Sequence, residues 1–125
     1  MKEVDMYTDG ACKGNPGAGG FCCILKYKGK EKLVSGGEAN TTNNRMELRA
    51  VISGLEILRE PCEVTVYSDS KYVVDAMKLG WAHGWKEKGW KKSDGKTALN
   101  TDLWERLLGL LEVHKVTFNW VKGHA

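Results

Sequence analysis

The order of apolar and polar residues predicts five strands and three helices. A period of two marks the first strand, where Val4, Met6 and Thr8 share one face and Asp9 lies on the other. A glycine-rich turn follows, and further short alternating runs read as an antiparallel meander and two later strands. The strands are expected over residues 4–9, 21–27, 33–41, 64–69 and 116–120.

A helical period replaces the alternation after Asn43, where apolar residues recur every three or four positions up to Leu58. Pro61 then stops the run. Gly54, in the middle of this helix, costs about 1 kcal/mol of helix propensity relative to Ala. Its presence there indicates a close approach between the helix and the sheet.

Two further helices are expected in the second half of the chain. Ser70 can cap a helix over residues 71–79, and Asn100 or Thr101 can cap the last helix. The predicted core face of the last helix carries Leu103, Leu107, Leu110 and Leu111. Together these elements predict an α/β fold, built in layers as a mixed five-stranded sheet flanked by helices.

The strand, helix and strand between residues 4 and 69 form a crossover unit. Such a connection makes the strand that ends at Asp69 parallel to the strand that carries Asp9, with a right-handed crossover. Neighbouring strands lie about 4.8 Å apart, so two carboxylates on them could share a metal ion. Glu47, in the first turn of the crossover helix, points to the same end of the sheet.

Composition indicates one globular domain over residues 1–125. The chain is 42% hydrophobic and 28% charged, and no apolar run reaches the roughly 18 residues that span a membrane. The N-terminus has no apolar signal-peptide centre, so we expect a cytoplasmic protein without membrane contact, and a monomer. The four cysteines lack metal-ligand spacing and are expected to be reduced thiols.

Positive charge is concentrated in one tract of the chain. The segment from Lys78 to Lys96 contains six lysines and only two acidic residues. Its net charge therefore exceeds the net charge of +3 of the whole chain. Tryptophans lie among these lysines, a combination that suits contact with nucleic acid because lysines neutralise phosphates and indoles pack against sugars or bases. The alternative is a solvated lysine face with tryptophans in the core, which we expect for at least one indole. The residues concerned are Trp81, Trp85, Lys86, Lys88, Trp90 and Lys91.

Each of the three carboxylates also has a purely structural interpretation. Asp9 could be a surface aspartate on an edge strand, Glu47 could close a capping box with Asn44, and Asp69 could cap a helix. These interpretations weaken jointly, because all three side chains are expected at one end of the sheet with no basic residue nearby. A divalent cation would relieve their mutual repulsion.

Oxygen ligands of this kind favour Mg²⁺, with Mn²⁺ as the second choice, over zinc. Two such ions roughly 4 Å apart, bound together with substrate, could activate a water and stabilise the leaving oxygen of a phosphodiester. The expected chemistry is therefore phosphoryl transfer to water.

Several motifs resemble those of bacterial type 1 ribonuclease H, in the same order from end to end. They are Tyr7–Gly10, Gly14–Gly17, Thr41–Leu48, Ser68–Ser70, Trp81–Trp90 and Trp120–Ala125. The resemblance implies the ribonuclease H-like fold. It also implies an endonuclease that cuts the RNA strand of RNA/DNA hybrids and leaves 5′-phosphate and 3′-hydroxyl ends.

The resemblance also implies roles for individual residues. The acidic site falls on Asp9, Glu47 and Asp69, and His124 matches a loop histidine that helps proton transfer or product release. Minor-groove contacts fall on Cys12, Asn15, Asn43 and Asn44, where the 2′-hydroxyls of RNA are displayed. Thr42 and Asn100 match a pocket for a DNA phosphate, and Trp81 and Trp85 match a channel for DNA sugars.

The chain departs from the family pattern at three places. Lys71 replaces a glutamine and exchanges a groove hydrogen bond for a phosphate contact, and Asn40 replaces an arginine of the phosphate pocket. The sequence ends before the family's fourth carboxylate, an aspartate on a helix beyond the Gly-His-Ala motif, so the last helix of the fold is expected to be missing here. Either the chain was cut or is only part of a longer one, which we favour because every upstream catalytic position is intact, or the protein is a weak or silent nuclease. The alternative to a nuclease is therefore a catalytically weak or silent module that binds hybrids.

Overall fold

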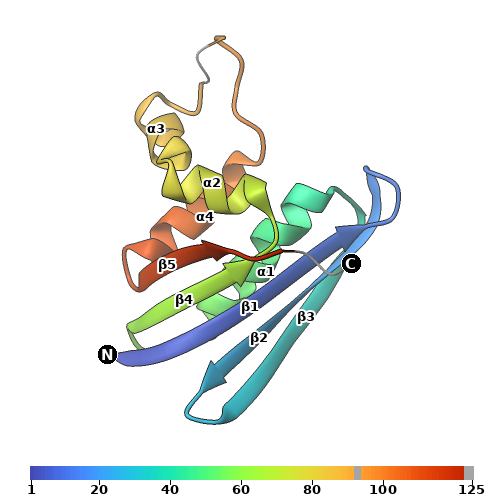
Figure 1. The fold of residues 1–125 in the computed structure, drawn as a ribbon. Helices are drawn as coiled ribbons and strands as arrows, with labels where there is room; N and C mark the ends of the chain where they lie inside the picture. The colour runs from blue at the N-terminus through green and yellow to red at the C-terminus, as the bar shows by residue number, and fades with distance from the viewer. Residues whose placement is uncertain (92–93, 123–125) are drawn as a thin grey trace.

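A computed structural model describes residues 1–91 and 94–122. Its elements are β1 (Lys2–Cys12), β2 (Gly17–Tyr27), β3 (Lys30–Thr41), α1 (Asn43–Glu56), β4 (Cys62–Ser68), α2 (Lys71–Lys78), α3 (Trp81–Glu87), α4 (Thr101–Leu111) and β5 (Lys115–Trp120). Five strands form one sheet, and the four helices lie beside it (Figure 1). The predicted α/β fold with a mixed five-stranded sheet is confirmed.

The strand order in the sheet is β3-β2-β1-β4-β5. β1 pairs antiparallel with β2 and parallel with β4, in a register that sets Tyr7 opposite Tyr67. β5 continues the parallel half of the sheet beside β4. The expected parallel pairing of β1 and β4 is therefore confirmed, with β2 and β3 as well as α1 between them in the chain, and it brings the segments that carry Asp9 and Asp69 next to each other.

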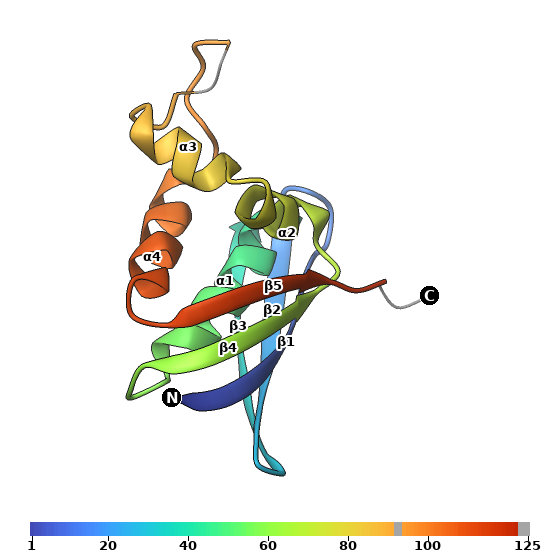
Figure 2. The ribbon, with the colours of Figure 1, turned by 60° about the vertical axis from the view of Figure 1, so that its left-hand side comes forward.

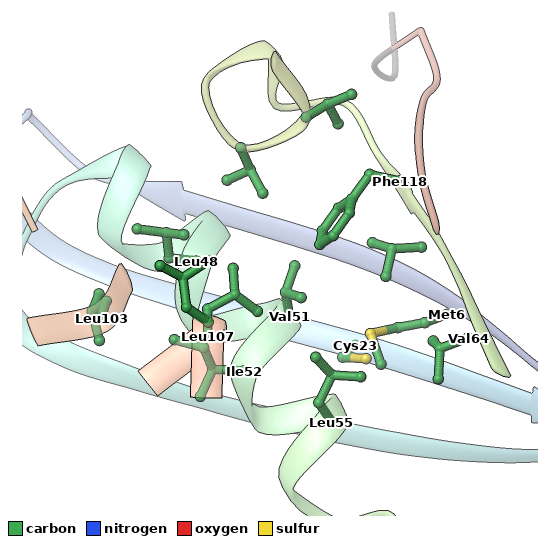
Figure 3. Close-up of a cluster of buried hydrophobic side chains, with 14 of the residues drawn as sticks. Met6, Cys23, Leu48, Val51, Ile52, Leu55, Val64, Leu103, Leu107 and Phe118 are labelled. Atoms are coloured by element: carbon green, nitrogen blue, oxygen red, sulfur yellow. The ribbon is translucent and has the colours of Figure 1, made fainter. Parts of the chain in front are cut away.

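The hydrophobic core lies between the sheet and the helices, with α1 at its centre. Figure 3 shows Leu48, Val51, Ile52 and Leu55 of α1 among side chains from the sheet and α4, and all four are almost completely buried. A Cβ atom on Gly54 would lie 2.6 Å from the Sγ atom of Cys23 and 2.8 Å from the Cε atom of Met6. The predicted close approach of α1 to the sheet at Gly54 is confirmed.

The helix starts differ in part from the expected caps. Thr42 caps α1, because its side chain accepts a hydrogen bond from the Arg45 N–H at 3.3 Å. The interpretation of Asn44 and Glu47 as a capping box is therefore wrong, since Asn44 already lies inside the helix. Ser70 caps α2 as predicted, by accepting from the Val73 N–H at 3.3 Å.

The buried face of α4 overlaps the predicted one in part. Its buried residues are Leu103, Trp104, Leu107 and Leu108, whereas Leu110 and Leu111 are only half-buried at the edge of the core. Trp104 is fully buried because its Nε1–H donates to the Tyr72 hydroxyl at 2.9 Å, which satisfies its one polar atom. The spacing of the four leucines therefore predicted only part of the buried face of α4, because it did not include Trp104.

All four cysteines are free thiols, as expected: Cys12, Cys22, Cys23 and Cys62. Cys22 and Cys23 lie on opposite faces of β2, and only Cys23 is fully enclosed. Among the residues that the structure describes, no helix combines the length and apolar character needed to cross a membrane.

Candidate metal centre and nucleic-acid interface

Three carboxylates from three different elements converge at one end of the sheet. Asp9 lies on β1, Glu47 lies in the first part of α1, and Asp69 directly follows β4. One carboxylate oxygen from each residue lies within 4.8 Å of the other two. The predicted meeting of these side chains is therefore observed, at the place where β4 ends beside β1 (Figure 1).

Glu47 is the buried member of the group, with 7% of its surface exposed. Its Oε1 atom accepts a hydrogen bond from the Gly10 N–H at 2.9 Å. Its Oε2 atom is buried and has no hydrogen-bond partner among the described residues. An unpaired buried carboxylate oxygen is unfavourable unless a cation or a proton neutralises it.

The pKa of Glu47 reflects this environment. The pKa of Glu47 is raised to about 7, mainly by burial; the Gly10 N–H opposes this shift, and the negative charges of Asp69 and Asp9 add to it. An ordinary surface carboxylate would not be shifted in this way. The oxygen-only ligand set and the unpaired Oε2 atom together fit a hard divalent cation such as Mg²⁺ or Mn²⁺.

A shallow hollow of about 150 Å³ opens beside the two aspartates. Asp9 and Asp69 line it together with Lys122, which contradicts the expectation that no basic residue lies near the carboxylates. Lys122 reaches this place because the chain after β5 stays beside the end of β4, where the Val121 N–H donates to the Ser68 carbonyl at 2.9 Å. No ion pair joins Lys122 to either aspartate within residues 1–91 and 94–122.

The residues predicted to contact the minor groove come from two neighbouring segments. The turn after β1 lies against the start of α1, because the Asn43 N–H donates to the Oδ1 atom of Asn15 at 3.0 Å. The thiol of Cys12 lies 3.2 Å from the Thr41 carbonyl oxygen, at the end of β3. Asn44 is exposed on the first turn of α1, so all four predicted groove residues lie at one end of the molecule.

The two residues of the predicted phosphate pocket, Thr42 and Asn100, both contact Arg45. Thr42 accepts from the backbone N–H of Arg45, and the Oδ1 atom of Asn100 accepts from the guanidinium of Arg45 at 3.2 Å. Asn100 precedes α4, but its side chain makes no capping bond because it is turned toward Arg45 and Tyr72. Asn100 is the N-cap residue of α4, as predicted, but it caps the helix without a side-chain hydrogen bond.

α3, which carries part of the basic tract, lies away from the sheet, beyond α2 and α4 (Figure 2). Trp81 is 46% exposed, whereas Trp85 and Trp90 are half-buried and pack against the main core. Trp85 meets Trp104 edge to face, and the Nε1–H of Trp90 donates to Glu105 at 2.9 Å. The expectation that at least one indole belongs to the core is confirmed, and the lysines at 86, 88 and 91 are exposed.

Lys71 and Asn40, where the chain departs from the family pattern, are both exposed. The ammonium of Lys71 sits 4.9 Å from the centre of the Trp120 ring, and Lys71 is exposed at the start of α2. Asn40 is exposed near the end of β3. His124, the predicted proton-transfer residue, lies outside the described residues.

The pattern of the sequence did not assign a role to Gly10 or Arg45. Gly10 supplies the N–H that holds Glu47, and a glycine directly after a strand carboxylate is a signal for such a close backbone approach. Arg45 is the third residue of α1 and reaches across to α4, a contact for which the linear sequence carries no local signal.

An acidic oxygen-ligand cluster and an exposed basic, tryptophan-bearing tract in one domain suit a metal-dependent nuclease. The RNase H family model matches residues 1–125. A ribonuclease H of Desulforamulus reducens is 58% identical over 125 residues, which are all of this chain and 79% of that protein. The chain therefore belongs to the RNase H family, as the motifs predicted.

Solved structures agree with this assignment. LC9-RNase H1, a type 1 RNase H with the type 2 active-site motif, has a TM-score of 0.87 at 34% identity; the match covers 100% of this chain and 65% of that chain. LC11-RNase H1, solved in complex with RNA/DNA hybrid, has a TM-score of 0.68 at 22% identity over 95% of this chain and 85% of that chain, a likeness of fold alone. The prediction of a metal-dependent ribonuclease H is confirmed at the level of the family, and a binding module without turnover is not favoured.

Proposed function

We propose that this protein hydrolyses the RNA strand of RNA/DNA hybrids and leaves 5′-phosphate and 3′-hydroxyl ends. The observation that carries the proposal is the meeting of Asp9, Glu47 and Asp69 within 4.8 Å, with one buried Glu47 oxygen left unpaired. Similarity to proteins named ribonuclease H over the full chain supports the substrate class. Residues 1–125 as one domain, a monomeric state and a cytoplasmic location stay predictions.

Asp9, Glu47 and Asp69 would hold two divalent cations, Mg²⁺ or Mn²⁺, together with substrate. When bound, such cations supply Lewis-acid activation of water and stabilisation of the leaving oxygen. The Gly10 N–H fixes Glu47 through Oε1 and leaves Oε2 available as a ligand. Asp9 is exposed and Asp69 half-exposed, so both carboxylates are accessible to a phosphodiester. His124 would assist proton transfer or product release.

Substrate would be held by the residues that flank this centre. The Asn15 and Asn43 segments, fixed to each other by a hydrogen bond, suit the minor groove with its 2′-hydroxyls, together with Cys12 and Asn44. Thr42 and Asn100 would bind one DNA phosphate. Trp81, Trp85 and Trp90, with the lysines at 71, 86, 88 and 91, would follow the DNA strand.

The direct test is incubation of the protein with a labelled RNA/DNA hybrid and Mg²⁺ or Mn²⁺. We expect cleavage of the RNA strand only, abolished by a chelator, with new 5′ ends that a phosphatase can dephosphorylate. RNA duplex and DNA duplex of the same sequence serve as controls. Binding of the hybrid without chelator-sensitive cleavage would contradict the proposal and favour the silent module.

We also predict that replacing Lys86, Lys88 and Lys91 together by Ala weakens hybrid binding and flattens its salt dependence. Each lysine that contacts a phosphate should lower the slope of log affinity against log salt by about 1. Fluorescence anisotropy over a salt series measures this slope. The matched control replaces Lys28, Lys30 and Lys32 together by Ala. These lysines are exposed around the β2–β3 turn, and their replacement removes the same amount of charge. Equal slopes for both triple variants would exclude the α3 tract from the interface.

A further inference from the structure

Arg45 joins the starts of α1 and α4 through three side-chain hydrogen bonds, and its backbone makes a fourth bond within the start of α1. Its backbone N–H donates to the Thr42 side chain at 3.3 Å, and its Nη1 atom donates to the Oδ1 atom of Asn100 at 3.2 Å. The guanidinium also forms a bidentate pair with Asp102, at 3.0 and 2.8 Å. α1 and α4 are therefore tied together at the end where Thr42 and Asn100 lie.

These bonds fix which way the Asn100 amide points. Arginine has only donors, so the side-chain oxygen of Asn100 must face Arg45 and its NH₂ group must face away. The Nδ2 atom donates to the Tyr72 hydroxyl at 3.2 Å, and the same hydroxyl accepts from the buried Trp104 indole at 2.9 Å. These contacts use one amide hydrogen of Asn100 and leave the other for an acceptor such as a phosphate oxygen.

The backbone conformation of Asn100 also depends on its side-chain bonds to Arg45 and Tyr72. Its φ of 61° lies in the left-handed region, which asparagine adopts more readily than most other residues with a side chain. The side-chain bonds to Arg45 and Tyr72 hold the residue in that conformation. Without them, Asn100 would gain other backbone and rotamer states, and its free N–H would lose its direction.

Arg45 is not placed to act as a positive charge toward a phosphate. Asp102 neutralises it, and their pairing lowers the pKa of Asp102. The Arg45 side chain is only 27% exposed. Its contribution is therefore geometric, in contrast to the exposed lysines of α3.

We propose that Arg45 is a positioning residue that sets Thr42 and Asn100 together as a receptor for a single phosphate of the DNA strand. This inference rests on the proposed function, because it takes those two residues as the phosphate pocket. A lysine at this position could not replace it, because one ammonium cannot reproduce the planar fork that spans Asp102 and Asn100.

The test compares Arg45→Gln and Arg45→Lys with a matched control, Arg106→Gln. Arg106 of α4 pairs with Glu56 of α1 at 2.8 Å, so it also joins these helices but lies away from Thr42 and Asn100. Both Arg45 variants are expected to raise KM for hybrid cleavage about tenfold with little change in kcat, as the loss of one charge-assisted contact implies. Arg106→Gln should leave KM unchanged.

A scan of single neutral methylphosphonates along the DNA strand distinguishes positioning from a general structural role. Binding is measured with Ca²⁺ in place of Mg²⁺. In the parent, one position should weaken binding about tenfold, and this penalty should vanish in Arg45→Gln and in Asn100→Ala. The double variant should bind no more weakly than Asn100→Ala.

Two outcomes would overturn the inference. One is a penalty at that position that persists in Arg45→Gln, and the other is no such position in the parent. Cleavage by the parent is recorded separately, so a parent that binds hybrid but does not cut it contradicts the proposed function while the scan still decides the role of Arg45. A parent that binds no hybrid overturns both.

Discussion

Replacing Asp9 by Asn is expected to abolish hybrid cleavage, by about a thousandfold or more in kcat, while hybrid binding stays equal or becomes tighter. Loss of one carboxylate removes a ligand from a group whose three oxygens lie within 4.8 Å. It also removes a negative charge that repels the approaching phosphate. Single-turnover cleavage and anisotropy measure the two effects separately.

The matched control for this variant is Asp5→Asn. Asp5 lies on the same exposed face of β1, but it belongs to no group of potential metal ligands in the part of the chain that is described. The Asp5→Asn variant should therefore cleave hybrid at the parental rate. If Asp9→Asn also keeps its turnover, the metal site lies elsewhere.

The second large effect is expected for Gly10→Ala. The added Cβ atom would lie 2.5 Å from the Met46 carbonyl carbon and 2.6 Å from the Glu47 backbone nitrogen. These are backbone atoms of α1 and cannot rotate away, so β1 and α1 must separate. We expect a loss of about 1–3 kcal/mol in the free energy of unfolding, as for other overpacked cores.

Activity should fall with stability in this variant, because the Gly10 N–H holds Glu47 at 2.9 Å. Urea denaturation measures the first effect, and cleavage under fully folded conditions measures the second. Gly20→Ala is the control, since its Cβ atom would meet only the Gly36 carbonyl oxygen at 3.5 Å, an ordinary contact. Equal stability and activity for the two variants would show that the contact between β1 and α1 is not as tight as described.

The sequence predicted the part of the site that depends on topology. The parallel pairing of β1 with β4 was expected from strands joined through a helix, and it was enough to bring Asp9 and Asp69 together, although β2 and β3 also lie between the two strands in the chain. Glu47 followed from its place on the inner stripe of α1. Alternation and helical period are local signals, and these three positions follow from local signals combined with one rule of handedness.

The features that the sequence did not predict depend on contacts between distant segments. α3 has no side-chain cap and no apolar period of its own, so its seven residues did not read as a helix. Asn100 has the residue type of a cap, but Arg45 and Tyr72 compete for its side chain. Lys122 lies near the carboxylates only because β5 runs parallel to β4.

The most direct test of the central claim, a shared cation at Asp9, Glu47 and Asp69, is a titration with Mn²⁺ followed by nuclear magnetic resonance. Paramagnetic broadening should appear first at the amide signals of residues 9, 10, 47, 69 and 70, and should disappear in Asp9→Asn at the same Mn²⁺ concentration. Broadening that begins elsewhere, or that is unchanged by Asp9→Asn, would contradict the claim.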